Sequence, residues 1–257
     1  MINLFTMTGK VVLLTGAAGG IGEATARMLA QAGAELVLTD IRPEALEALA
    51  TELRLGGALV HTLPCDLAQP ASVRELAREA MAIAGGVDVL ICNGGMEGHV
   101  GPLGEASDAA IDVLLSVNLR SAMTLSAELA PGMANRGRGA IVLVASIAGL
   151  RGNKAIGLYG VAKAGLIQLA RNLAVEWGPS GVRANAISPG LTATPFAKPI
   201  LESADYLPRR LSLTPLRRAG QAEEIAASIL FLASDASGFI TGHNLIADGG
   251  TTISDGN

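Results

Sequence analysis

Short runs of the sequence are apolar at nearly every position, and most are separated by segments of helix length. The runs span Val11–Leu14, Glu35–Thr39, Ala58–Leu63, Val87–Ile91, Ala140–Val144, Val182–Ile187 and Asn244–Ala247. Helices are predicted at Ile21–Ala32, Pro43–Leu55, Ser72–Ala84, Ala109–Ala134, Tyr159–Trp177 and Glu223–Ala233. Strands that are apolar throughout belong in a parallel sheet that helices cover on each side. The alternation therefore predicts an α/β fold with a doubly wound parallel sheet of about seven strands and helices on both faces.

The length of 257 residues suits one large α/β domain better than two average ones. We therefore expect a single domain over residues 1–257. The longest irregular segment, Ser188–Ala219, contains five prolines. A loop of this length in a compact domain is often a lid or a binding loop, so we predict a substrate lid around residues 190–218.

Charge and composition exclude several classes of protein. A net charge of −4 and an aromatic content of 3% argue against binding to nucleic acid. Cys65 and Cys92 form no CxxC motif and fit a reducing compartment. The longest run without charged residues, Ala184–Ala197, has 14 residues, fewer than the about 18 that a membrane span needs. Since Met1–Leu4 also lack the basic start of a signal peptide, we expect a cytoplasmic protein with no nucleic-acid or membrane partner.

A glycine-rich turn, Thr15-Gly16-Ala17-Ala18-Gly19-Gly20-Ile21-Gly22, joins the first predicted strand to the first helix. Glycines let the backbone approach a pyrophosphate, and a helix N-terminus adds unpaired N–H groups and a positive dipole. The alternative is that these glycines serve only tight helix–strand packing. The strand–turn–helix context favours a dinucleotide site in a Rossmann-like sheet.

Asp40 ends the second predicted strand, about 20 residues beyond the glycine turn. A carboxylate here accepts hydrogen bonds from the ribose hydroxyls of an adenosine and repels a 2′-phosphate. We therefore expect NAD as the cofactor in preference to NADP. Arg42 is close enough in sequence to weaken this preference, and Asp40 could also cap the helix that begins at Pro43.

Tyr159 and Lys163 are four residues apart in a predicted helix and so share one helix face. An ammonium beside a tyrosine favours the phenolate and lowers the phenol pKa from about 10, which suits acid–base catalysis. The alternative is an ordinary solvated pair on a helix surface. Ser146 follows the strand that ends at Val144, at the sheet edge where open α/β folds bind ligands, and its alternative role is a turn serine.

With these residues, nearly the whole chain, about Thr8 to Thr251, resembles the short-chain dehydrogenases/reductases. The matching motifs are Thr15-Gly16-xxx-Gly20-x-Gly22, Asp66-Leu67, Cys92-Asn93-Gly94-Gly95, Val182 to Gly190 with Thr194, and Ile240-Thr241-Gly242 through Asp248-Gly249-Gly250. The family usually has Asn-Asn-Ala-Gly at residues 92–95. We expect Cys92 to weaken its strand and Gly94 to loosen the loop beside the cofactor.

The resemblance implies a catalytic tetrad of Asn118, Ser146, Tyr159 and Lys163. Tyr159 would exchange a proton with the alcohol or ketone oxygen, and Ser146 would stabilise charge on that oxygen. Lys163 would lower the pKa of Tyr159 and bind the nicotinamide ribose, and the backbone of Asn118 would hold a water of the proton relay. The implied NAD site consists of Gly16, Gly19, Gly20, Ile21, Gly22, Asp40, Ile41, Asp66, Leu67, Asn93, Gly94, Tyr159, Lys163, Pro189, Gly190, Leu191, Thr192 and Thr194.

The implied activity is NAD-dependent interconversion of a secondary alcohol and a ketone by hydride transfer. One alternative is a 3-oxoacyl-carrier-protein reductase, whose acidic partner would dock on Arg136, Arg138 and Arg171. Others are a polyol or sugar dehydrogenase and a dinucleotide sensor without activity. The turn also fits TGxxGxxG, the spacing of the longer epimerases and dehydratases, but Pro189-Gly190 and Asp248-Gly249-Gly250 favour the compact oxidoreductases.

The predicted substrate pocket is mostly apolar and consists of Met96, Ser146, Ile147, Leu150, Asn153, Phe196 and Tyr206. The charged side chains of the lid have mixed signs and are expected on its solvated outer face; they are Lys198, Glu202, Asp205, Arg209 and Arg210. We therefore expect an uncharged, hydrophobic alcohol or ketone, cyclic or aryl-substituted, as the substrate.

His61, His99 and His243 lack the spacing of metal ligands, so no metal site is expected. The predicted helices Ala109–Ala134 and Tyr159–Trp177 carry more alanine and leucine than one sheet face can cover. Resembling enzymes pair these helices across a two-fold axis and use the C-terminal strand as a second interface. The resemblance therefore implies a homotetramer.

Overall fold

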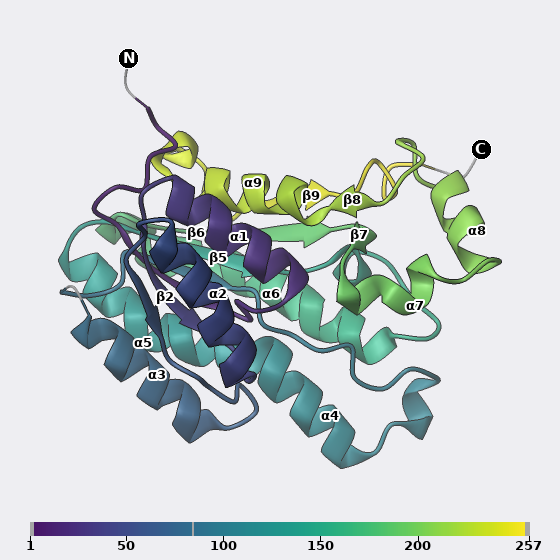
Figure 1. Cartoon of the computed structure of the whole chain (residues 1–257). Helices are drawn as coiled ribbons and strands as arrows, with labels where there is room; N and C mark the ends of the chain where they lie inside the picture. The colour runs from purple at the N-terminus through teal and green to yellow at the C-terminus, as the bar shows by residue number, and fades with distance from the viewer. Residues whose placement is uncertain (1–2, 84, 255–257) are drawn as a thin grey trace.

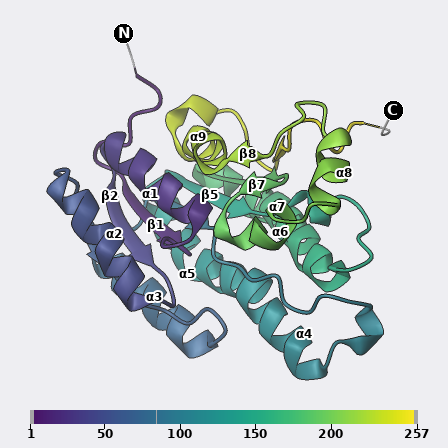
Figure 2. The same cartoon turned by 45° about the vertical axis from the view of Figure 1, so that its right-hand side comes forward.

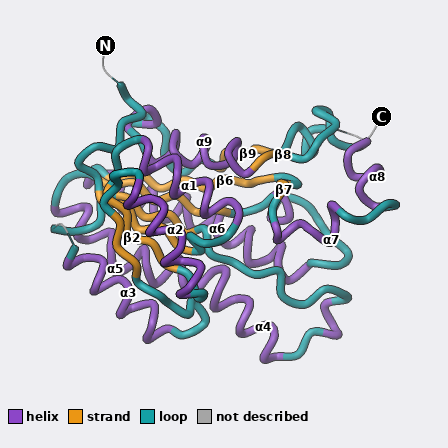
Figure 3. Tube along the Cα trace, in the orientation of Figure 1, coloured by secondary structure: helices purple, strands orange, loops and turns teal. Residues whose placement is uncertain are grey.

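A parallel sheet forms the centre of the molecule in the computed structural model, which describes residues 3–83 and 85–254 (Figures 1 and 3). Its strands are β1 (Val11–Thr15), β2 (Glu35–Thr39), β3 (Val60–Thr62), β4 (Val89–Cys92), β5 (Gly139–Val144), β6 (Val182–Pro189) and β9 (Asn244–Ala247). The order is β3-β2-β1-β4-β5-β6-β9, and every neighbouring pair is parallel. The predicted fold class is confirmed. The order reverses between β1 and β4, the kind of switch point at which such sheets bind ligands.

Helices cover both faces of the sheet, as predicted (Figure 2). One layer consists of α1 (Gly20–Gln31), α2 (Pro43–Leu55) and α9 (Ala222–Ala233), and the other of α3 (Pro70–Ala82), α5 (Ser121–Asn135) and α6 (Gly157–Trp177). Side chains of β1 alternate between the layers, because Val12 and Leu14 pack on the first and Val11 and Leu13 on the second. The predicted end of the third helix at Ala84 lies outside the described residues.

The predicted helix Ala109–Ala134 is interrupted. It consists of α4 (Asp108–Leu115), a π-helical turn (Ser116–Arg120) and α5. The turn contains buried Asn118, whose side chain bonds to the backbone of a neighbouring loop, and such π-turns often mark functional sites.

The segment predicted to be irregular contains two short helices, α7 (Lys198–Leu201) and α8 (Tyr206–Ser212). Its prolines do not prevent helix formation, because Pro199 lies in the first turn of α7, where a missing N–H costs little. Figure 1 shows both helices beyond the ends of β5 and β6, beside the small sheet of β7 (Thr192–Ala193) and β8 (Gly220–Gln221). Across the described ranges, no helix has the length and apolar character that crossing a membrane requires.

Candidate active site

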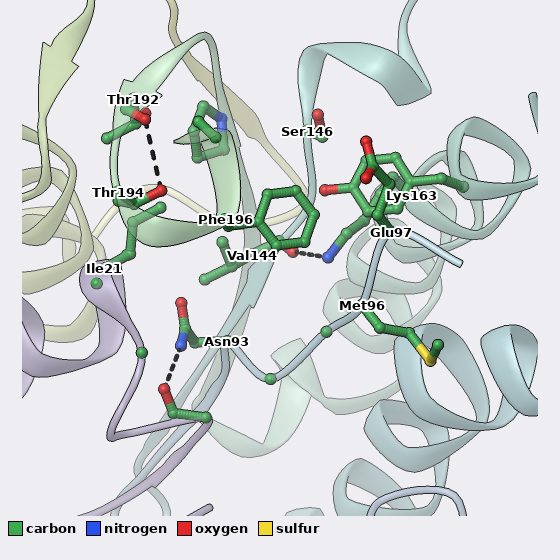
Figure 4. A pocket seen from close by; sticks show the side chains of 18 of the residues that line it. Ile21, Asn93, Met96, Glu97, Val144, Ser146, Lys163, Thr192, Thr194 and Phe196 are labelled. Carbon is green, nitrogen blue, oxygen red and sulfur yellow. Dashed lines mark hydrogen bonds between the residues drawn. The ribbon is translucent and has the colours of Figure 1, made fainter. Parts of the chain in front are cut away.

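A cavity of about 550 Å³ opens at the carboxyl edge of the sheet. All the residues of the predicted NAD site line it, as do Met96, Ser146, Ile147, Asn153, Phe196 and Tyr206 of the predicted substrate pocket. Leu150 does not line the cavity and is 39% exposed, because it follows the short turn Ile147–Gly149 on its outer side. Figure 4 shows Ile21, Thr192 and Thr194 on one side of this space and Ser146, Glu97 and Lys163 on the other, with Phe196 between them.

The glycine turn is held against the end of β4. Gly16 has a φ of +63°, which favours glycine, and a Cβ on Gly22 would overlap the Gly16 carbonyl oxygen. The Asn93 side chain donates to the carbonyl oxygens of Thr15 (3.1 Å) and Gly16 (3.0 Å), one of which is drawn in Figure 4. These contacts fix the backbone of the turn with its surface open to the cavity.

Asp40 is buried at the end of β2, where its carboxylate organises the turn. It accepts hydrogen bonds from the backbone N–H groups of Ala18 (3.1 Å) and Arg42 (3.1 Å), and from Arg42 Nε (3.0 Å). Arg42, not Asp40, occupies the N-cap position of α2, and no side chain caps this helix. The capping role considered for Asp40 is therefore wrong, and the carboxylate faces the cavity already paired with Arg42.

Gly94 lets its neighbours approach the loop after β4. A Cβ at Gly94 would lie 2.5 Å from Leu67 Cδ1 and 3.3 Å from Thr15 Oγ1. The missing methyl group thus leaves room for Leu67 and the glycine turn, while the expected loosening of the loop stays a prediction. Asp66, beside Leu67, accepts a hydrogen bond from the Ala68 N–H (2.9 Å) and also lines the cavity.

Tyr159 and Ser146 meet on the cavity wall. Burial raises the pKa of the Tyr159 phenol to about 12; a hydrogen bond with the Ser146 side chain lowers it, and the charge of Glu97 raises it. The phenol pKa is therefore raised, opposite to the lowering that the sequence predicted. The Phe196 ring lies 6.1 Å from the Tyr159 ring, centroid to centroid, and covers the tyrosine from the side of the predicted lid.

Lys163 is buried, and its ammonium donates a hydrogen bond to the Val144 carbonyl (2.8 Å; Figure 4). It lies 5.5 Å from the centroid of the Tyr159 ring. Burial lowers the pKa of Lys163 to about 8. The hydrogen bond to β5 thus holds the buried lysine at the cavity wall, next to the Tyr159 ring.

Asn118 does not line the cavity but positions its wall. Its Oδ1 accepts from the Met96 N–H (2.8 Å) and its Nδ2 donates to the Met96 carbonyl (2.7 Å). This side-chain pairing occupies both polar groups of Met96 and anchors the loop that also carries Glu97. The sequence identified Asn118 through the resemblance alone, since nothing local in a predicted helix indicates such a contact.

The segment after β6 closes the cavity over the glycine turn. A Cβ at Gly20 would lie 2.7 Å from Thr194 Cγ2, and a Cβ at Gly190 would lie 2.7 Å from Asp248 Cα. Thr194 donates to the Thr192 carbonyl at 3.4 Å (Figure 4). In each contact, segments far apart in sequence approach this closely because one partner is glycine, Gly20 against Thr194 and Gly190 against Asp248.

Three charged side chains line the substrate end of the cavity: Glu97, Arg151 and Arg210. The predicted position of Arg210 on the outer face of the lid is wrong, because Arg210 lines the cavity from α8 whereas Arg209 does not. Arg151 was not predicted to line the pocket, since a single arginine in a loop forms no motif in the sequence. The role of this segment as a lid stays a prediction.

The residues at the other end of the cavity fit a nicotinamide dinucleotide. The N-terminus of α1 has no side-chain cap, and the glycines leave a cradle that side chains would fill. The carboxylates of Asp40 and Asp66 line the part of the cavity next to this turn. In residues 3–83 and 85–254, no group of three or more His, Cys, Asp or Glu side chains could hold a metal ion.

Known proteins resemble the chain over nearly its full length. Residues 16–252 match the family described as enoyl-(acyl carrier protein) reductase. Dehydrogenase/reductase SDR family member 4 of Oryctolagus cuniculus is 31% identical over 244 residues, 95% of this chain and 94% of that protein. The cis-4-hydroxycyclohexanecarboxylate dehydrogenase of Sinomonas cyclohexanicum is 37% identical over 243 residues, 95% of this chain and 96% of that protein. A gluconate 5-dehydrogenase from Burkholderia cenocepacia J2315, crystallised with NADP and tartrate, superposes with a TM-score of 0.92 at 31% identity and 98% coverage of each chain.

Proposed function

Because the chain belongs to the short-chain dehydrogenase/reductase family, we propose that it transfers a hydride between NAD and a secondary alcohol or its ketone. One observation carries the proposal: Tyr159 and Ser146 meet at the wall of a cavity whose other end fits a dinucleotide. Two similar proteins are named for hydroxy acids, cis-4-hydroxycyclohexanecarboxylate and gluconate, so the substrates to be tested include carboxylates.

The residues of the cavity wall supply proton transfer. When bound, the nicotinamide would donate or accept the hydride. Tyr159 donates a proton to the ketone oxygen during reduction and removes the hydroxyl proton during oxidation. The Ser146 hydroxyl donates a hydrogen bond to the same oxygen and stabilises the charge that develops there. Since the pKa of Tyr159 is about 12, the phenol is protonated at neutral pH, which is the form that reduction uses.

The preference for NAD rests on the charges at the end of β2. Asp40 is 7% exposed and lines the cavity, so a 2′-phosphate would meet a partly desolvated negative charge. Arg42 could attract that phosphate, but its Nε is bound to Asp40 and its charge is partly compensated. The pair therefore favours NAD without excluding NADP.

The carrier-protein alternative has less support. Arg136 and Arg138 each lie 3.5 Å from Asp88, which precedes β4 at the amino edge of the sheet, whereas the cavity opens at the carboxyl edge. The single Asp88 carboxylate compensates part of their charge, and both arginines lie at the sheet edge opposite to the cavity. A free small molecule is therefore the proposed substrate.

The homotetramer predicted from the sequence remains a proposal. It is supported by apolar side chains that α5 and α6 leave exposed: Met123 (49%), Val161 (60%) and Val175 (81%). Large exposed apolar side chains on neighbouring helices are typical of a surface that another subunit covers. We expect light scattering to give the mass of four 26.0 kDa chains, and a single-chain mass would refute the proposal.

The activity is tested by following nicotinamide absorbance with a panel of cyclic, aryl, sugar and hydroxy-acid alcohols and their ketones, each with NAD and with NADP. We expect turnover of at least one pair and a higher kcat/KM with NAD. Turnover of no substrate would overturn the proposed reaction. Equal kcat/KM with both cofactors would overturn only the preference for NAD.

A further inference from the structure

Two arginines line the substrate end of the cavity from different segments. Arg151 follows the short turn Ile147–Gly149, and Arg210 lies on α8. Arg151 is exposed and Arg210 half-buried. Burial lowers the pKa of Arg210, and the positive charge of Arg151 lowers it further, so the two guanidinium groups act on one another. The fold therefore brings two like charges together where a ligand would lie.

Neither guanidinium has a carboxylate within ion-pair distance anywhere in the described ranges. Other cations of the same region do: Arg218 lies 2.6 Å from Glu224 and Lys198 lies 3.7 Å from Glu202. Asp248 acts on Arg210 through its charge, but its two oxygens accept the N–H groups of Gly250 (2.8 Å) and Thr252 (2.7 Å). The positive charge of the arginine pair is therefore available to a bound anion.

The reacting end of the cavity carries the opposite sign. Glu97 is half-buried, lines the cavity and acts electrostatically on Tyr159. Among the described residues it forms no ion pair with Arg151 or Arg210. An anionic group on the substrate would be repelled at Tyr159 and attracted at the arginines, so the charges of the wall can orient the molecule.

We propose that Arg151 and Arg210 together bind a carboxylate of the substrate, and that Glu97 directs this group away from Tyr159. The substrate class is then a hydroxy acid or keto acid whose carboxylate lies apart from the reacting carbon. Planar guanidinium groups match carboxylates in a two-pronged geometry, which a partly desolvated cavity strengthens. The inference rests on the proposed function and deepens it, and it replaces the uncharged substrate expected from the sequence.

The test compares two ketones that differ only in charge, 4-oxocyclohexanecarboxylate and its methyl ester. With NADH, we expect the acid to have a kcat/KM about tenfold or more above that of the ester, the scale of one charged hydrogen bond. Arg210→Gln and Arg151→Gln should each lower the value for the acid by about tenfold to hundredfold, mainly through KM. The value for the ester should not fall. Arg209 is the neighbouring arginine outside the cavity, so Arg209→Gln is the matched control and should change kcat/KM for neither the acid nor the ester.

A binding measurement keeps the inference separate from the reaction. We expect calorimetry on the protein with NADH to show cyclohexanecarboxylate binding about tenfold or more tighter than cyclohexanecarboxamide, with the difference lost in Arg210→Gln. Failure of all turnover with this binding pattern intact would overturn the proposed reaction and uphold the carboxylate site. Equal binding of acid and amide, or equal kcat/KM of acid and ester, would overturn the carboxylate site whatever the turnover.

Discussion

The dinucleotide end and the substrate end of the cavity are built differently. At the dinucleotide end, strands of one sheet end side by side. Their loops are joined by hydrogen bonds to the backbone, such as that from the Asn93 side chain to the Thr15 carbonyl oxygen, and by close contacts of glycines. At the substrate end, the wall comes from the loops after the neighbouring strands β4 and β5 and from helix α8, which is not part of the sheet. The ring contact between Tyr159 on α6 and Phe196, in the segment before α7, is also between side chains.

This difference indicates which end of the cavity governs the choice of cofactor and which governs the choice of substrate. A cofactor site built from backbone geometry tolerates few changes in the turn, because a Cβ added at Gly16, Gly20 or Gly22 would collide with its neighbours. A substrate wall made of side chains from separate segments can change its chemistry one residue at a time. We therefore expect substitutions at the first end to affect folding and cofactor binding, and substitutions at the second end to change substrate choice.

The largest effect is expected where the two ends meet, at Tyr159. Tyr159→Phe removes the proton that the reaction exchanges and should lower kcat by about two to four orders of magnitude. Fluorescence titration should give the wild-type affinity for NADH, because the phenyl ring keeps the packing against Phe196. A Tyr159→Phe variant with nearly full activity would refute the assigned role.

The tightness of the dinucleotide end is tested by a pair of glycine substitutions. Gly22→Ala places a methyl group into the Gly16 carbonyl oxygen and should cost about 1–3 kcal/mol in the free energy of unfolding, with weaker NAD binding. Gly152→Ala is the control from the substrate end, since nothing lies within 4 Å of its added Cβ. Urea denaturation measures both. Similar losses in the free energy of unfolding of the two variants would contradict the tighter packing of the dinucleotide end.

Cofactor choice should respond to the two members of the ion pair in opposite directions. Asp40→Ala removes the repelling charge and should narrow the NAD-over-NADP ratio of kcat/KM by about tenfold. Arg42→Ala leaves the carboxylate without its partner and should widen that ratio. Steady-state kinetics with NAD and with NADP measures this ratio in both variants. A ratio that moves the same way in both variants would show that the pair does not act through charge.

The smallest effect concerns pH. Oxidation needs the Tyr159 phenolate, so its rate should rise with pH through the alkaline range, because the phenol pKa is about 12. The negative charge of Glu97 raises that pKa, so Glu97→Gln should lower it and shift the oxidation profile to lower pH by less than about one unit. Glu202→Gln, outside the cavity, is the control. A shift of the profile to higher pH in Glu97→Gln would contradict the effect of the Glu97 charge on the pKa of Tyr159.

Much of this molecule could be predicted from sequence because the signals are local. Apolar strands such as Val11–Leu14 must be covered on both faces, and the spacing of Tyr159 and Lys163 puts both on one side of α6. The residues of the predicted NAD site line one cavity because parallel strands end at one edge of the sheet.

Several incorrect predictions depend on contacts between distant segments. The predicted helix around Asn118 is interrupted by a π-helical turn, in which the Asn118 side chain pairs with Met96. The pKa of Tyr159 moves up because burial outweighs the other influences. No periodicity along the chain encodes these neighbours.

By itself, the sequence determined the fold class, the glycine turn and the residues proposed to exchange a proton with the substrate. Only the tertiary structure decided which charges share the substrate end of the cavity. Arg151 and Arg210 lie in different elements of the chain, and only folding turns both toward one space with Glu97. The physical reason is that electrostatic energy depends on distance and burial, which arise from packing between segments and not from the order of residues.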